Sequence, residues 1–427
     1  MKSTISKLFY AATALFMFAA AASVTSCKEE ETVVPVEPLE FGIAPQMREL
    51  SFMAARPEAY TYEVTTNRET WAVKADADWC TVDTSGNTFT VKPSPNFSFD
   101  ERSGATVTVT VEDSVVFEIA VSQKPLEVYA AGSYNNASAY WRNQELVDMS
   151  VVTGGTSLND IYVTRSGDVH LTGYGIMGFN TTGFYWSEAM GLFTTNRREG
   201  GSGSAFSVFV DEETSTVYFT THEGWTNEDW SQTYQACLWT NFEPEDEPES
   251  MSAGDVIVDN GNVYVLYDGF YTVNGEKVNL EEIKDGNYVS CMEIHDGDVY
   301  VGGNYLDYDK FCPAYWVNGK ANPIPTTISS QVYSISIDSN GDVYLGGSEG
   351  LGLDRCAAYW KNGEMTAVTE YANACIGEIF ALDGQLAILY FEENAAGNTT
   401  VKCSLDGNVV EISDGAVPAY VEAGFIL

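Results

Sequence analysis

The chain has 427 residues, of which 61 are Asp or Glu and 21 are Lys or Arg, so its formal net charge is −40. Because affinity for nucleic acids depends largely on Lys and Arg neutralising phosphates, this charge excludes a nucleic-acid-binding protein. Apolar residues make up 44% of the chain, which is enough to bury hydrophobic cores and excludes a disordered polyelectrolyte. The length corresponds to roughly two to three domains.

Residues 1–26 have the pattern of a lipoprotein signal peptide. Two lysines precede an apolar run from Leu8 to Ala22, which is shorter than the about 20 residues of a membrane-spanning helix. Small residues then lead to Cys27. The segment resembles a bacterial lipobox, with Val24 where Leu is usual, and the resemblance implies lipid on the Cys27 thiol and cleavage before it. An ordinary cleaved signal with an incidental cysteine is the alternative.

The segment after the cysteine predicts the cellular location of the protein. Residues 28–31 read Lys-Glu-Glu-Glu and resemble the acidic export tag of lipoproteins displayed on the outer face of the outer membrane; a solvated charge run is the alternative. Residues 27–38 contain two prolines and are expected to form the lipidated tether. We therefore expect an outer-membrane lipoprotein exposed at the cell surface, attached to the membrane only through its N-terminal lipid.

Residues 39–125 are predicted to form an immunoglobulin-like β-sandwich. Alternating or β-branched runs such as residues 60–64, 88–91 and 105–111 are separated by short polar turns. Close spacing of short strands favours such a sandwich. Trp71 and Trp79 are expected in its core, because aromatic residues dominate such cores.

The same segment resembles the BACON domain family in the order and spacing of several short motifs. These are Glu69-Thr70-Trp71-Ala72-Val73, Ala77-Asp78-Trp79-Cys80-Thr81-Val82, Pro95-Asn96, Glu101-Arg102 and Val121-Ser122-Gln123. The family's name associates it with carbohydrate. We expect this copy to act as a spacer or accessory binder that presents the larger domain.

Residues 126–427 repeat one pattern at intervals of about 43 residues, the length of a four-stranded propeller blade. Each unit has a Val-Tyr or related strand, a variable loop, and a Tyr-Trp strand that often ends in Asn-Gly, a strong hairpin signal. The units resemble bacterial propellers with Tyr-Trp-Lys-Asn-Gly repeats. The array starts on a second strand at Val128 and ends on a first strand at residues 419–427. This predicts an all-β chain with a seven-bladed β-propeller closed by the C-terminal strand.

Candidate binding residues lie in the loops between the second and third strands of the repeats, which differ sharply in length. Aromatic rings there can cover the apolar face of a sugar while acids and amides bond its hydroxyls. Loop-on-loop packing is the alternative for any single residue. The candidates are Trp225, Trp230, Tyr234, Tyr134, Tyr174, Tyr305, Asp307 and Tyr308.

No catalytic constellation is recognised, and no metal or cofactor is expected. The three histidines, His170, His222 and His295, lack the spacing of zinc ligands. The turn at residues 338–342 superficially resembles a calcium loop, but Val343 occupies the position that needs glycine, so a plain hairpin is favoured. The Gly-rich residues 199–204 lead into a strand rather than a helix, so they read as a linker-like loop.

These observations favour a surface lipoprotein whose propeller loops bind an extracellular glycan or glycoprotein non-covalently. A glycan hydrolase or lyase is the first alternative, requiring two converging carboxylates or a tyrosine with His222. The second alternative is a scaffold that docks other surface proteins. Strongly anionic polymers are disfavoured as partners by the charge.

Overall fold

The computed structural model describes residues 37–427 except 151–153, 178–179, 199, 228 and 285. The strands within these residues form nine four-stranded sheets, so this part of the chain has an all-β architecture. The predicted signal peptide, Cys27 and nearly all of the predicted tether lie outside the described residues. Among the residues described, no helix is long and apolar enough to cross a membrane.

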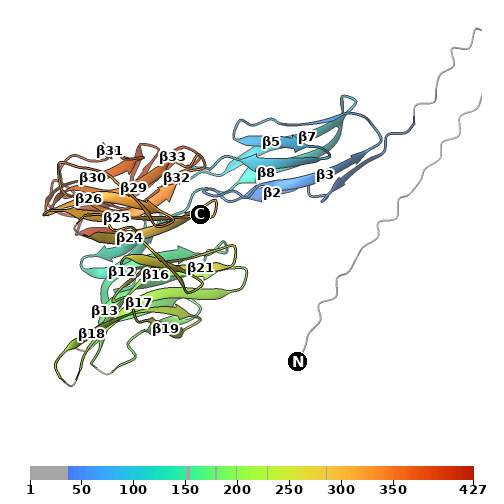
Figure 1. The fold of residues 1–427 in the computed structure, drawn as a ribbon. Coiled ribbons are helices and arrows are strands. Elements are labelled where there is room, and N and C mark those ends of the chain that lie inside the picture. The colour runs from blue at the N-terminus through green and yellow to red at the C-terminus, as the bar shows by residue number, and fades with distance from the viewer. Residues whose placement is uncertain (1–36, 151–153, 178–179, 199, 228, 285) are drawn as a thin grey trace, which may run out of the picture.

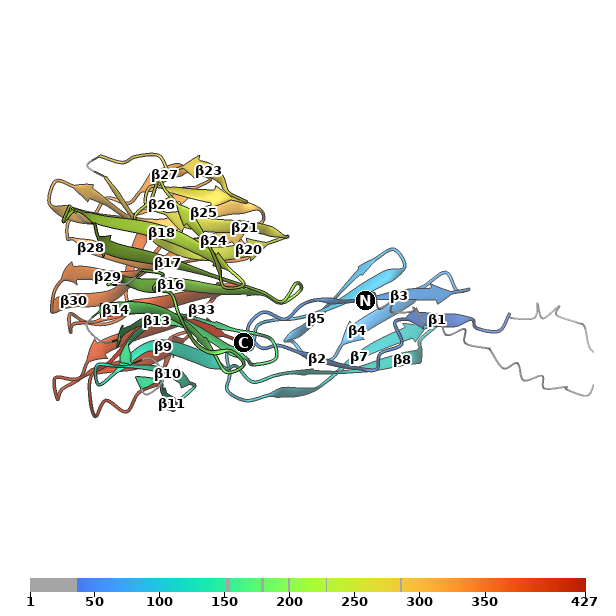
Figure 2. The same ribbon diagram turned by 90° about the horizontal axis from the view of Figure 1, so that it is seen from below.

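Two sheets form the N-terminal part, which extends from one side of the remaining sheets (Figures 1 and 2). In pairing order, the first contains β1 (Phe41–Ala44), β3 (Tyr60–Thr66), β6 (Thr88–Pro93) and β5 (Cys80–Ser85), and the second contains β2 (Glu49–Phe52), β8 (Ser114–Gln123), β7 (Arg102–Val111) and β4 (Trp71–Ala75). Both sheets contribute to one core, in which Tyr62 stacks on Phe89. Trp71 and Trp79 pack against this core, as expected from the sequence.

The remaining sheets each follow the order of the chain, and we number them sheet 1 to sheet 7. Sheet 2 contains β12 (Gly155–Val163), β13 (Val169–Met177), β14 (Asn180–Ser187) and β15 (Gly191–Thr194). Sheet 3 contains β16 (Ser202–Asp211), β17 (Thr216–Thr226), β18 (Gln232–Thr240) and β19 (Glu243–Glu247). Sheet 4 contains β20 (Ala253–Asp259), β21 (Asn262–Tyr267), β22 (Phe270–Val273) and β23 (Glu276–Asn279).

Sheets 5 to 7 repeat the same arrangement. Sheet 5 contains β24 (Asn287–His295), β25 (Asp298–Asp307), β26 (Lys310–Val317) and β27 (Lys320–Pro323). Sheet 6 contains β28 (Ser330–Ile337), β29 (Val343–Leu351), β30 (Asp354–Lys361) and β31 (Glu364–Ala367). Sheet 7 contains β32 (Cys375–Leu382), β33 (Gln385–Glu393), β34 (Thr399–Leu405) and β35 (Asn408–Glu411). Each sheet packs on the next through its first strand.

Sheet 1 combines the two ends of the repeat array. It consists of β36 (Ala419–Ile426), β9 (Val128–Tyr134), β10 (Ala137–Arg142) and β11 (Glu145–Asp148). β36 pairs with β9 from Ala419 opposite Tyr134 to Ile426 opposite Val128, which is the predicted pairing of the C-terminal strand. β36 also contacts sheets 2 and 7. The last strand of the chain therefore supplies the first strand of its first repeat.

The repeated tryptophans of the third strands belong to the cores between sheets. Trp141, Trp316 and Trp360 are at most 1% exposed, and Trp239 is also buried. These rings therefore pack between the sheets and are not accessible for stacking on a ligand. The repeated pattern of the sequence thus marks the interior of this part of the protein.

A β-bulge interrupts the first strand of every sheet in this part. The irregular positions are Asn159, Phe206-Ser207, Gly254-Asp255, Ser290, Tyr333, Gly377 and Glu422. Glycines of the second strands make room for the bulges: a Cβ on Gly347 would collide with the carbonyl oxygen of Gln331. Bulges locally re-aim side chains, and here they accompany polar side chains that bond neighbouring sheets.

Half-buried carboxyl groups beside these bulges tie one sheet to the next. Asp160 accepts the Val208 N–H at 2.8 Å, Asp255 accepts the Met292 N–H at 2.7 Å, and Glu293 accepts the Ile337 N–H at 3.0 Å. Burial raises the pKa of Asp160 to about 6 and those of Asp255 and Glu293 to about 7. The pKa of Glu378 rises to about 8, first because of burial and further because of Asp160 and Asp255.

The N-terminal part contacts one end of the seven sheets. Ala54 and Ala55 join a buried cluster with β9, β34 and β36, and Glu58 forms an ion pair with Arg165, in the turn after β12. A cavity of ≈410 Å³ at this junction is lined by residues 55–58 and 92–95 together with the ends of β24, β28 and β32. We call this end of the sheets the proximal face.

Candidate functional site

The opposite end of the seven sheets, which we call the distal face, carries the turns between the second and third strands. Since neighbouring strands are antiparallel, all seven of these turns lie at the end opposite Arg165 and the other junction residues. Every candidate residue chosen from the sequence lies in or beside one of these turns, in sheets 1, 2, 3 and 5. The structure therefore brings the candidates to one face, but not into one pocket.

Trp230 and Tyr308 are the most prominent candidates. Each lies in the turn of its hairpin, β17–β18 and β25–β26, and each is 87% exposed. Both adopt a left-handed backbone conformation, with φ of 67° for Trp230 and 61° for Tyr308. Such a conformation costs an ordinary L-residue roughly 1–2 kcal/mol.

The equivalent turns of other sheets show the residues that are usual at these positions. Left-handed residues there are Asn135 and Asn136 in sheet 1, Gly269 in sheet 4, Gly352 in sheet 6 and Gly397 in sheet 7. Glycine and asparagine tolerate this conformation, whereas a bulky aromatic residue in it is a genuine outlier. Sheets 3 and 5 thus carry a strained, exposed ring where the fold alone is satisfied by Gly or Asn, which points to function.

Side-chain hydrogen bonds support the turn that holds Trp230. Asn227 Oδ1 accepts from Trp225 Nε1 at 3.1 Å, and Asn227 Nδ2 donates to Ser231 Oγ at 2.9 Å and Thr233 Oγ1 at 2.8 Å. Asp229 accepts from both the N–H and the hydroxyl of Ser231, and these bonds lower the pKa of Asp229. The turn is therefore pre-organised, with an ionised carboxylate next to the exposed indole.

Two aromatic candidates have roles other than those expected from the sequence. Tyr305 is only 2% exposed and belongs to a buried cluster of sheets 4 and 5, so its prediction as a ligand platform is wrong. Trp225 is half-buried, and the Arg198 guanidinium lies 3.8 Å from its ring centroid. That ring face is occupied by the cation, so Trp225 supports the hairpin and is a poorer platform than Trp230.

The side chains of the remaining candidates already make contacts within the protein. Tyr134 packs against a buried cluster, with its hydroxyl 3.3 Å from Asp414, and Tyr174 is half-buried. Asp307 forms an ion pair with Lys284 at 2.8 Å. Tyr234 is exposed and its hydroxyl donates to Gln232 at 2.7 Å. Tyr234 is thus an accessible ring in the same hairpin as Trp230, whereas the others contribute mainly to the frame.

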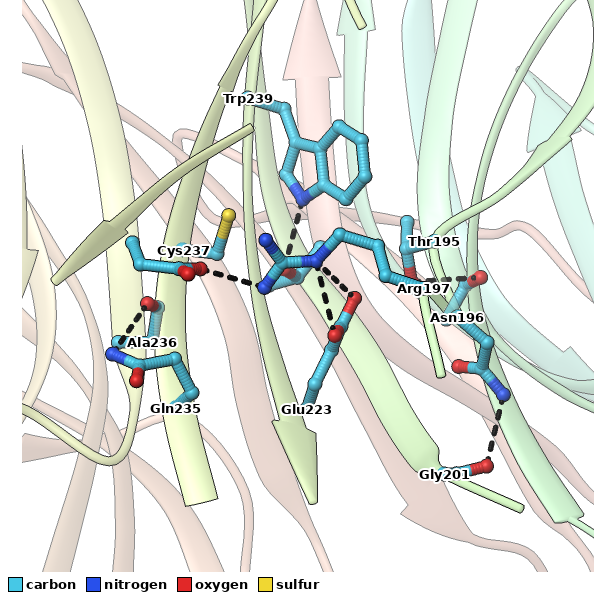
Figure 3. A network of polar contacts seen from close by, with 12 residues as sticks. Thr195, Asn196, Arg197, Gly201, Glu223, Gln235, Ala236, Cys237 and Trp239 are labelled. Carbon is cyan, nitrogen blue, oxygen red and sulfur yellow. Dashed lines mark hydrogen bonds and ion pairs between the residues drawn. The ribbon is translucent and has the colours of Figure 1, made fainter. Parts of the chain in front are cut away.

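A partly buried ion network lies below the Trp230 hairpin, and Figure 3 shows its arrangement. Arg197 Nε lies 3.1 Å from both carboxylate oxygens of Glu223, and its Nη2 donates to Asp246 at 2.6 Å. The Glu223 side chain is only 5% exposed. Burial raises the pKa of Glu223, and Arg197 opposes that rise. The network links the segment before β16 to β17 and β19.

This network was not predicted from the sequence, because the Gly-rich segment after Arg198 has the composition of a linker. Asn196 Nδ2 donates to the Gly201 carbonyl at 3.0 Å and to Thr182 Oγ1 at 3.1 Å, so Gly201 is connected to β14 through Asn196. The adjacent pair Arg197-Arg198, in a chain with only 21 basic residues, was the available signal.

Replacement of Arg197 should destabilise the distal face of sheet 3. We expect Arg197→Gln to lower the free energy of unfolding by about 2 kcal/mol, because it leaves the Glu223 carboxylate buried without its cation. Arg198→Gln is the matched control, since Arg198 lies over an exposed hairpin; its effect should be below about 1 kcal/mol. Urea unfolding of both variants measures the difference, and equal effects would contradict the assigned roles.

Several other exposed apolar side chains occupy the distal face. They lie in or beside the turns between second and third strands, in the segments that lead to first strands, or within first strands: Ile176, Tyr288, Ile328, Tyr333, Leu351, Leu353 and Tyr371. Single exposed apolar side chains are normal on protein surfaces, so these residues alone do not define a site.

His222, which was named for the enzyme alternative, is half-buried in β17. His222 packs against Phe206 with ring centroids 5.1 Å apart, and burial lowers its pKa. Within the part of the chain that the structure describes, no three His, Cys, Asp or Glu side chains are placed to hold a metal ion. The cysteines at 80, 237, 291, 312, 356, 375 and 403 are free and buried.

Comparison with known proteins gives similarity at the level of solved structures. No known family profile and no curated protein matches the chain. A DUF4784 family protein from Bacteroides caccae is 10% identical, with a TM-score of 0.31 over 77% of this chain and 95% of that chain. The β-propeller domain of the Trilobed protease from Pyrococcus furiosus is 13% identical, with a TM-score of 0.38 over 60% and 84%. The Aleuria aurantia lectin, solved with Fucα1-6GlcNAc, is 7% identical, with a TM-score of 0.32 over 74% and 94%.

Proposed function

We propose that the protein binds an extracellular glycan or glycoprotein non-covalently through its distal face. The observation that carries this proposal is the pair of strained, exposed rings at Trp230 and Tyr308. An aromatic face covers the apolar side of a pyranose, and acids and amides such as Asp229 and Gln232 can bond sugar hydroxyls. Rigid hairpins that present aromatic rings are suited to recognition.

We further propose that sheets 1 to 7 are the blades of a propeller, closed by the pairing of β36 with β9. The two N-terminal sheets would then be an immunoglobulin-like, BACON-like sandwich. In this arrangement the sandwich acts as a spacer on the proximal face and the ligand-binding turns face the other way.

The location that we propose follows from the signal and tether motifs of residues 1–38. Lipid on Cys27 would anchor the chain in the outer membrane, and the acidic residues after it would direct the protein to the cell surface. The N-terminal sheets would then lie nearest to the membrane, with the distal face toward extracellular polymers.

Trp230→Asn tests the proposed binding role without harming the fold. We expect at least tenfold weaker binding to the glycans or mucins that the wild-type protein binds, because a stacking platform is lost. The free energy of unfolding should not fall, since asparagine tolerates the positive φ of this position. A glycan array and a mucin pull-down measure binding, and urea unfolding measures stability.

The matched control is Met190→Asn, which alters an exposed side chain in the turn between β14 and β15. It should bind as the wild type does. Equal binding by Trp230→Asn and wild type would reject the role of this ring, and release of free oligosaccharide during the assay would favour a hydrolase or lyase instead.

A further inference from the structure

Sheet 4 ends lower on the distal face than the two sheets on either side of it. Counted from the repeated Val-Tyr pair of each second strand, β17 continues from Val217 to Thr226 and β25 from Val299 to Asp307, whereas β21 continues only from Val263 to Tyr267. At the usual rise of about 3.3 Å per residue, the hairpins of sheets 3 and 5 extend roughly 13 to 17 Å further than that of sheet 4.

The low hairpin of sheet 4 is closed and well packed. Tyr267 and Phe270 flank its turn and are buried. The Gly269 carbonyl accepts the Leu280 N–H at 3.0 Å. A Cβ placed on Gly269 would meet no atom within 4 Å, so the space above this turn is open. Sheet 4 is therefore shorter than its neighbours at the distal face, and its hairpin is nevertheless completely formed and packed.

The two strained rings lie on either side of sheet 4. Trp230 belongs to sheet 3 and Tyr308 to sheet 5, and packed sheets are about 10 Å apart, so the two turns are separated by about 20 Å. A single sugar or a disaccharide is too short to contact both rings. A ligand that uses both must be an extended chain lying over sheet 4.

We infer that the distal face binds an internal segment of a neutral, linear glycan chain, which crosses sheet 4 between Trp230 and Tyr308 with both of its ends free. This inference rests on the proposed function and specifies its ligand. A neutral chain fits the local charges, because Asp229 lies next to Trp230 and the Lys284 cation beside Tyr308 is already paired with Asp307. An anionic chain would be repelled by this acidic protein.

Binding should therefore depend on chain length and not on chain ends. The probes are laminarin, xylan, mannan and galactan, with size-fractionated oligosaccharides from whichever of them binds, measured by calorimetry with the full protein. Affinity is expected to rise at least tenfold once the oligosaccharide is long enough to reach both rings. Chemical modification of the reducing end should leave the affinity of the longest chains unchanged.

Variants of the two rings separate this inference from the proposed function. For long chains, Trp230→Asn and Tyr308→Asn should each weaken binding at least tenfold, and the double variant should retain no length dependence. If affinity is already maximal with a disaccharide, or if only one ring matters for long chains, the inference is wrong while glycan binding stands. If no glycan on the array or in this panel binds to the folded protein, both the proposed function and this inference fail.

Discussion

Removal of residues 419–427 is expected to abolish cooperative folding of the seven sheets. β36 supplies the first strand of sheet 1, and its Ala419, Val421 and Ile426 are buried in the cluster that also holds Trp141. Without it, β9 has an unpaired edge and the cores toward sheets 2 and 7 are open to water. Typical domains are stabilised by only about 5–15 kcal/mol, so we expect the loss of a complete, largely buried strand to be enough to unfold the sheets.

Circular dichroism and gel filtration of the truncated chain measure this effect. We expect no cooperative unfolding transition and self-association through the exposed edge. A synthetic peptide of residues 419–427 should restore the transition when it is added in trans, which separates loss of the strand from general damage. A truncated chain that stays monomeric and unfolds at the wild-type midpoint would contradict the role of β36.

The half-buried carboxyl groups of the first strands should make the protein less stable as pH rises. The pKa values of Asp160, Asp255, Glu293 and Glu378 are raised, chiefly by burial, to between about 6 and about 8. The folded protein therefore keeps protons that the unfolded chain releases above about pH 4. Stability is full below that pH and is lost progressively as the pH rises to about 8.

The expected loss is large because each tenfold change in a protonation equilibrium corresponds to about 1.4 kcal/mol. We expect the free energy of unfolding to fall by on the order of 5 kcal/mol between about pH 4 and pH 9. The variant Asp255→Asn/Glu378→Gln should lose much of this dependence and be more stable than the wild type at high pH, since neutral amides replace the half-buried carboxylates.

Overall acidity acts in the same direction, so a control with the same change in charge is needed. Asp309→Asn/Glu364→Gln removes two exposed carboxylates, which lie outside the half-buried group. Its pH dependence, measured by urea unfolding, should match that of the wild type. If both double variants change stability equally at every pH, repulsion across the surface is the cause and the half-buried carboxyls are not.

The sequence was sufficient to predict the repeats, because their signal is periodic and local. The Tyr-Trp and Asn-Gly pairs mark third strands and the turns that follow them. Two units lack the Tyr-Trp pair and have their third-strand turns at Asn274-Gly275 and Asp406-Gly407, and they too form complete four-stranded sheets. The pairing of β36 with β9 follows from counting strands. None of these inferences needs knowledge of distant contacts.

The site was predicted only in part, because it depends on where strands end and on contacts distant in sequence. Tyr305 and Tyr308 look equivalent in the sequence, yet the first is buried in β25 and the second lies in the turn. The positive φ of Trp230, the pairing of Arg197 with Glu223, and the bulges that bring Asp160 and Asp255 near Glu378 are likewise tertiary properties.

Hydroxyl-radical footprinting of the wild-type protein tests the central claim most directly, since it reports which rings a bound glycan covers. With a saturating glycan that the array identifies, oxidation of Trp230 and Tyr308 should fall at least several-fold. Oxidation of Met47 in the N-terminal part and Met190 at the opposite end of sheet 2, both exposed, should not change. Undiminished oxidation of Trp230 and Tyr308 with the glycan bound would contradict the assignment of the distal face as the binding site.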